Sequence, residues 1–135
     1  MGFRSRLTLL EFSLLVVLVA IAAWIGTGQY QSAQRRELLE IMQDDLRNLK
    51  MAQEAYAADN GGLFMPYSVV TTANHQYGYA PSSGVTVEIS EPSASGWSAT
   101  ATHVNAPGTV CGIFIGELPL GSPNPATESS QPACE

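Results

Sequence analysis

The chain has 135 residues, a hydrophobic fraction of 45% and a formal net charge of −6. This length bounds it to one domain with at most one appended element. All six Lys and Arg residues lie within the first 50 positions, whereas residues 59–135 carry six carboxylates and no Lys or Arg. An acidic surface of this kind repels phosphate backbones, so the sequence disfavours direct nucleic-acid binding by the C-terminal part of the chain.

An apolar stretch runs from Leu7 to Ile25 and contains a single charge, Glu11. As a helix, a stretch of this length spans about 30 Å of hydrocarbon, which predicts a membrane-spanning segment. Residues 1–6 form a short basic leader, and positive charge before an apolar stretch keeps that end cytoplasmic. A carboxylate inside such a stretch costs about 2.5–3.5 kcal/mol on insertion scales, so Glu11 is predicted to be functional.

The helical pattern continues beyond the apolar stretch, unlike that of an ordinary secretory signal. Gly26 and Gly28 each weaken a helix by roughly 1 kcal/mol relative to Ala, which predicts a flexible or locally melted segment there. The alternative is that these two glycines allow close helix contact. From Tyr30 to Ala58 apolar residues recur at three- and four-residue spacing, and 59-DNGG-62 then ends the helix. We therefore expect a helix of about fifty residues, roughly 75 Å long.

The C-terminal part predicts a small antiparallel sheet. Apolar and polar residues alternate in 85–89 and in 97–103, and the apolar segment 109–115 follows as a third strand. Short turns rich in Pro, Gly and Ser separate these segments. Residues 63–83 predict a loop that contains an early strand. The fold class is therefore α+β, with the apolar face of the sheet packed on the amphipathic part of the helix. The predicted parts are residues 1–6, 7–29, 30–58 and 59–135.

The tail from Glu117 to Glu135 is rich in Pro, Ser and Gly and is too polar to order itself alone. Cys111 and Cys134 are the two cysteines of the chain, and a bridge between them closes this tail into a loop. A loop of that span gains about 3 kcal/mol in the chain-entropy model. Two cysteines on the outer side of a membrane predict a disulfide rather than a thiol site.

No pattern for catalysis or cofactor binding occurs in the sequence. His75 and His103 are isolated, the spacing of Cys and His does not match a zinc site, and the abundant Ser and Thr residues form no nucleophile motif. A phosphate-binding Gly loop is also missing. The sequence therefore predicts a protein that is not an enzyme and that binds neither a cofactor nor a metal.

The N-terminal pattern resembles that of the bacterial type IV pilins and pseudopilins. The resemblance is carried by the short basic leader, then LTLLEF, then the unbroken apolar helix. The segments GWSATATH, TVCGIFIG and the terminal PAC are similar to the heads of these pilins, which extends the likeness over most of the chain. The resemblance implies one long N-terminal helix, a small antiparallel head and a disulfide-closed C-terminal loop that contacts partners.

The resemblance also implies a processing step and a role for Glu11. In this family a prepilin peptidase cuts before the apolar helix, and the new first residue is N-methylated. A cut between Arg6 and Leu7 makes Leu7 the methylated residue and places Glu11 at the fifth mature position, where the family has a Glu. The implied role of Glu11 is in assembly, where its carboxylate pairs with the terminal ammonium of a neighbouring subunit and sets the register. The family prefers Gly before the cut, where this chain has Arg6; a cut after Gly2 would place Glu11 ninth.

The resemblance implies a homopolymer, an extracellular type IV pilus filament that starts from subunits held in the inner membrane. The implied partners are further copies of the chain, the prepilin peptidase and the pilus assembly machinery. Adhesion, twitching motility or DNA uptake would be activities of the whole fibre. The alternatives are a minor pilin or type II secretion pseudopilin, and a single-pass membrane protein with a small extracytoplasmic binding head.

Overall fold

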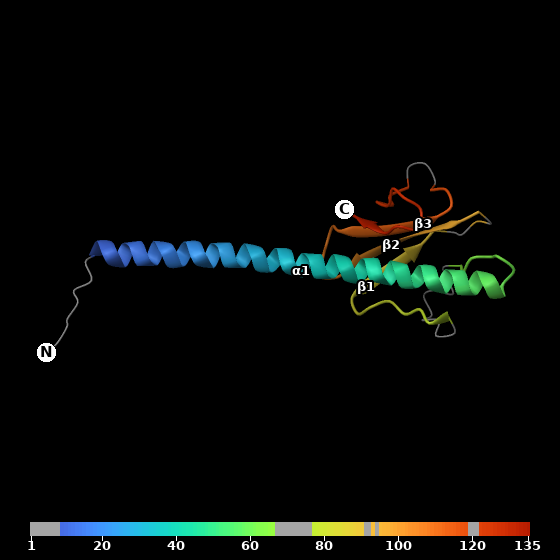
Figure 1. Ribbon diagram of the computed structural model, residues 1–135, viewed down its shortest axis with the longest axis horizontal. Helices are drawn as coiled ribbons and strands as arrows, with labels where there is room; N and C mark the ends of the chain where they lie inside the picture. The colour runs from blue at the N-terminus through green and yellow to red at the C-terminus, as the bar shows by residue number, and fades with distance from the viewer. Residues whose placement is uncertain (1–8, 67–76, 91–92, 94, 119–121) are drawn as a thin grey trace. The chain divides into compact units, whose positions relative to one another are not determined.

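The computed structural model describes residues 9–66, 77–90, 93, 95–118 and 122–135. These residues form one helix, α1 (Leu9–Asp59), and a sheet of four strands (Figure 1). The strands are β1 (Val85–Ile89), β2 (Trp97–His103), β3 (Val110–Ile115) and β4 (Ala133–Cys134), in the order β1-β2-β3-β4. Every neighbouring pair is antiparallel. The predicted α+β class, with one long N-terminal helix and an antiparallel sheet, is confirmed.

Packing divides the chain into an N-terminal unit, Met1–Arg36, and a C-terminal unit, Glu37–Glu135. Helix α1 contributes residues to both units. The boundary falls at Arg36 because residues 11–26 and 30–37 of the helix are exposed, and partial burial begins at Leu38. The boundaries predicted near residues 29 and 58 follow hydrophobicity and helix length, whereas this boundary follows contacts.

Helix α1 is 51 residues long, close to the predicted fifty. It is continuous because its sequence contains no proline, and the two glycines at its middle remain helical. The helix ends as predicted. The Gly62 N–H donates to the Ala57 carbonyl over 2.8 Å, and Gly61 and Gly62 have φ angles of 67° and 85°. This left-handed backbone favours glycine, and it satisfies a carbonyl that the end of the helix leaves unpaired.

The core of the C-terminal unit lies between one stripe of α1 and one face of the sheet. Met42, Leu46, Leu49 and Ala52 are almost fully buried on the helix, and their spacing of three and four residues places them on one side. They join the inward-facing residues of β1, β2 and β3 in a single cluster. The residues that β2 contributes at its centre, Ala99 and Ala101, are small. Figure 1 shows the strands alongside the C-terminal part of α1.

The sheet is a meander whose two faces meet different surroundings. On the inner face Ala99 lies opposite Ile89 on one side and Ile113 on the other. On the outer face Thr86, Glu88 and Thr102 are exposed, whereas Ser98, Gly112 and Phe114 are buried. The outer face is therefore solvated over β1 and covered over β3.

The fourth strand does not come from the segment in which the sequence predicted an early strand. Residues 63–66 and 77–83 contain no strand, and residues 67–76 of that segment lie outside the described residues. The fourth strand is instead β4, which pairs with β3 through Cys111 and Gly112. Glu135 extends this pairing, because its N–H donates to the Val110 carbonyl over 2.9 Å and its carbonyl accepts from the Val110 N–H. A two-residue strand is too short for a periodic pattern to predict.

Candidate functional site

The N-terminal unit presents an apolar helical surface. Every residue from Glu11 to Gly26 is exposed, and Trp24 reaches 82% exposure. Fully burying one large apolar side chain is worth about 1.5–3 kcal/mol, so covering this surface could contribute on the order of 10–20 kcal/mol. The exposed large apolar side chains of this segment are Phe12, Leu14, Leu15, Val16, Val17, Leu18, Val19, Ile21, Trp24 and Ile25.

This segment could cross a membrane by its length and composition. A membrane anchor and a signal sequence near the N-terminus share these properties. In either case the uncovered apolar surface requires lipid or another apolar surface against it, because a contiguous patch of this size is rarely left in water.

Glu11 lies in the first turn of α1, and its side chain is exposed. A carboxylate there interacts favourably with the positive end of the helix macrodipole, by about 0.3–1 kcal/mol at an exposed position. Arg6 and Leu7, the predicted cleavage and methylation residues, lie outside the described residues. Their roles stay predictions.

The glycine pair at the middle of α1 has regular helical backbone in this structure. A Cβ at Gly26 would meet no atom within 4 Å outside its own helical neighbourhood, so no contact of the described chain requires glycine there. Gly28 is likewise helical. Local melting at Gly26 and Gly28 during assembly stays a prediction.

The disulfide between Cys111 and Cys134 is present, as the sequence predicted. It joins two residues that lie directly opposite each other on β3 and β4. The Gln43 amide on α1 donates to Cys134 Sγ over 3.3 Å, and the Ser130 N–H donates to the Phe114 carbonyl over 2.8 Å. The tail is therefore attached to the helix and to the sheet as well as closed by the bridge.

Asn124 fixes the tail on the outer face of the sheet, a role that the sequence reasoning missed. Its amide nitrogen donates to the carbonyls of Ala99 and Ile113, over 3.1 and 3.0 Å, so it joins β2 to β3. Its amide oxygen accepts from the Ala126 N–H over 3.0 Å. A Cβ at position 112 would overlap Asn124 Oδ1, which explains the glycine in the middle of β3.

Two buried polar residues of α1 attach the helix to the segments that follow it. Gln53, fully buried, accepts from the Met65 N–H over 2.6 Å and donates to the Met65 carbonyl over 3.0 Å. Asp45, 2% exposed, accepts from the Ser82 N–H and hydroxyl, each over 2.8 Å. Both positions fall in the phase of the buried stripe, so a polar residue in that phase was the signal that could have identified them.

Tyr79 lies in the core close to Asp45. Burial of the ring, and secondly the Asp45 carboxylate, raise the pKa of the Tyr79 hydroxyl well above its ordinary value of 10.0. Among the described residues the hydroxyl has no hydrogen-bond partner, and the same holds for the Trp97 ring nitrogen. Both residues support the fold through packing rather than through polar contacts.

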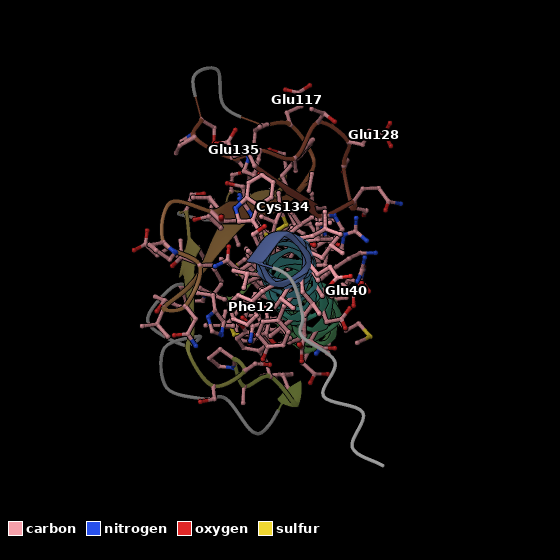
Figure 2. All side chains as sticks on the ribbon, turned by 90° about the vertical axis from the view of Figure 1, so that its left-hand side faces the viewer. Phe12, Glu40, Glu117, Glu128, Cys134 and Glu135 are labelled. Carbon is pink, nitrogen blue, oxygen red and sulfur yellow. A yellow bond between two sulfur atoms is a disulfide. The ribbon has the colours of Figure 1, made fainter. Side chains whose placement is uncertain are left out.

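The acidic residues of the tail do not converge. Figure 2 shows Glu117, Glu128 and Glu135 directed outward at separate points of the C-terminal unit. Within the described parts of the chain, no group of three or more His, Cys, Asp and Glu side chains is placed to hold a metal ion.

No protein-family model, curated protein or solved structure matches this chain. The candidate functional elements therefore rest on its own geometry: the exposed apolar segment with Glu11, and a compact C-terminal unit closed by a disulfide.

Proposed function

We propose that this chain is the repeating structural subunit of an extracellular filament of the type IV pilus class, and that it polymerises through its N-terminal helix. One observation carries the proposal. Helix α1 is apolar and exposed from Glu11 to Gly26, and the same unbroken helix continues into a disulfide-closed unit, where one side of it is buried. The exposed apolar surface of such a helix contacts the lipid of the inner membrane before assembly and the helices of other copies after it.

The position of Glu11 supports assembly rather than simple anchoring. After a cut before Leu7, the new terminal ammonium of one subunit lies among apolar helices and requires a counter-charge. The Glu11 carboxylate of a neighbouring copy supplies it, and an unpaired charge in such a bundle would cost several kcal/mol. Charge pairing then fixes the register of neighbouring subunits. A simple membrane anchor does not require a carboxylate at this position.

The C-terminal unit contributes the fibre's outer surface in this proposal. Its tail is held by a disulfide, by Asn124 and by β4, so a surface of otherwise polar and irregular sequence keeps one shape. Adhesion, motility and DNA uptake would be properties of the assembled fibre. The prepilin peptidase and the assembly machinery are the partners that such a subunit requires.

The proposal is tested by replacing Glu11 in the full-length chain. Glu11→Ala should reduce sheared surface filaments at least tenfold while the membrane level of the chain stays unchanged; Glu11→Asp is the matched control that retains the charge. In wild-type filaments the chain should be the dominant band, with an N-methylated Leu7 as its first residue. Normal filaments from Glu11→Ala would refute the charge-pairing argument. A membrane-bound monomer without fibres would refute the filament itself, and a chain present only in traces would indicate a minor pilin or pseudopilin.

A further inference from the structure

A groove in the C-terminal unit separates the exposed side of α1 from the tail. Its helical wall includes Asp44, Arg47, Lys50 and Met51, and its other wall is formed by 130-SQP-132. The groove is open and has a volume of about 470 Å³. We call it the tail groove.

The tail groove holds both cations of the C-terminal unit. Residues 37–135 contain eleven carboxylates, and Arg47 and Lys50 are their only Lys and Arg residues. Both line one groove together with Asp44, so the lining carries one net positive charge on a unit that is otherwise acidic. A second copy of the chain presents an acidic surface of opposite sign, and like-charged surfaces elsewhere on the unit would repel it.

The two cations are available for a new partner at small cost. Arg47 pairs with Asp44 over 2.5 Å, and Lys50 pairs with Glu54 over 3.5 Å, one turn apart on the same helix. Exposed pairs of this kind contribute about 0–1 kcal/mol each. The surface of a partner excludes water from the groove, and the lower effective dielectric strengthens the attraction between the two cations and a carboxylate on that surface. Such a carboxylate therefore competes with the pairs within the helix.

The shape of the groove is held in place before any partner arrives. The Ser130 N–H donates to the Phe114 carbonyl, and the wall ends at the β4 strand and its disulfide. Ser130 has a φ of 69°, a left-handed conformation that costs a non-glycine residue roughly 1–2 kcal/mol. Met51 adds an apolar side chain that is 60% exposed. A groove whose walls are already in place loses little conformational entropy on binding.

We propose that the tail groove is the lateral contact between neighbouring subunits, in which Arg47 and Lys50 of one copy bind carboxylates on the C-terminal unit of another copy. This inference rests on the proposed filament. It adds a second, electrostatic contact to the helical one. The contact weakens as salt increases, because both partners are at the surface.

The test uses the full-length chain in filament-producing cells. Arg47→Glu with Lys50→Glu should lower the yield of sheared filaments at least fivefold. The neutral pair Arg47→Gln with Lys50→Gln should lower it less and should remove most of its dependence on salt. The control for total charge is Ser83→Glu with Val104→Glu, which changes the net charge as much as the neutral pair does at exposed positions outside the groove. This control should leave the yield within twofold of wild type.

A photo-crosslinker at position 51 then identifies the occupant. The expected product is a dimer of the chain, in which position 51 of one copy is joined to a peptide of the other copy that carries an exposed carboxylate. A Glu→Lys change at that carboxylate should restore filament formation in the Arg47→Glu, Lys50→Glu variant. Wild-type yields from that variant, with its disulfide and membrane level intact, would overturn the inference while the filament proposal stands. A crosslink to another protein, or the absence of any crosslinked product, would also overturn the inference and leave the filament proposal standing. Absence of filaments from the wild type would instead overturn the proposed function.

Discussion

The bridge between Gln53 and Met65 is the polar contact whose loss should most weaken the C-terminal unit. Gln53 pairs with both backbone polar groups of Met65, and both residues are fully buried. Gln53→Ala leaves a buried N–H and a buried carbonyl without partners, each at a cost of about 1–3 kcal/mol. The variant should therefore lose about 3–5 kcal/mol, a large fraction of the 5–15 kcal/mol typical of a domain.

Two further variants separate hydrogen bonding from packing. Gln53→Met keeps the size of the side chain and removes both bonds, so it should still lose about 2–4 kcal/mol. Gln53→Glu can reproduce both bonds only when protonated, because an ionised carboxylate would face the Met65 carbonyl. Burial and that carbonyl raise the pKa of the introduced carboxyl in the folded state above its unfolded value of about 4.3.

The sign of the pH effect follows from linkage. With a raised folded pKa, the folded Gln53→Glu variant holds its proton while the unfolded chain has released it. Its stability relative to wild type is therefore retained below about pH 4.3 and falls as pH rises, by up to about 1.4 kcal/mol per pH unit.

Urea unfolding of the full-length chain in non-denaturing detergent provides the measurement. A Trp24→Phe background leaves the buried Trp97 as the only tryptophan and so reports on the C-terminal unit. The reasoning is refuted if Gln53→Met unfolds within about 1 kcal/mol of wild type, the lower end of the cost of one unpaired buried group. It is also refuted if the difference between Gln53→Glu and wild type is flat from about pH 4 to pH 7.

Two further predictions concern the sheet and the core. Gly112→Ala should destabilise the C-terminal unit by about 2–3 kcal/mol in the same assay because the new methyl group displaces Asn124, and it should cost less in an Asn124→Ala background; equal costs would contradict this contact. Tyr79→Phe should leave stability at pH 7 unchanged or raise it by up to about 1 kcal/mol, because the hydroxyl is buried without a partner among the described residues. Since the pKa of Tyr79 is raised in the folded state, wild type should lose stability relative to this variant as pH rises above 10.0, and parallel pH curves would argue against it.

Periodicity and termination signals in the sequence determined the helix and three of the strands. An apolar stretch, then a stripe at three- and four-residue spacing, then 59-DNGG-62, leaves little alternative to one long helix that ends where it does. Alternation likewise identified β1 and β2, and a short apolar segment after a turn identified β3. These features depend on neighbours along the chain, which the sequence contains directly. The disulfide was equally accessible, because the chain has only two cysteines.

Tertiary structure alone decided the contacts between residues far apart in the chain. The pairing of Gln53 with Met65, of Asp45 with Ser82 and of Asn124 with two strands depends on where loops return, which no local pattern encodes. The same holds for β4, which is a strand because the end of the tail returns to pair with β3. The apolar segment with Glu11 was evident from composition. It is exposed and its description depends on no contact with a distant part of the chain. The tail groove was not, because its two walls come from residues about eighty positions apart and meet only when the tail folds back onto α1.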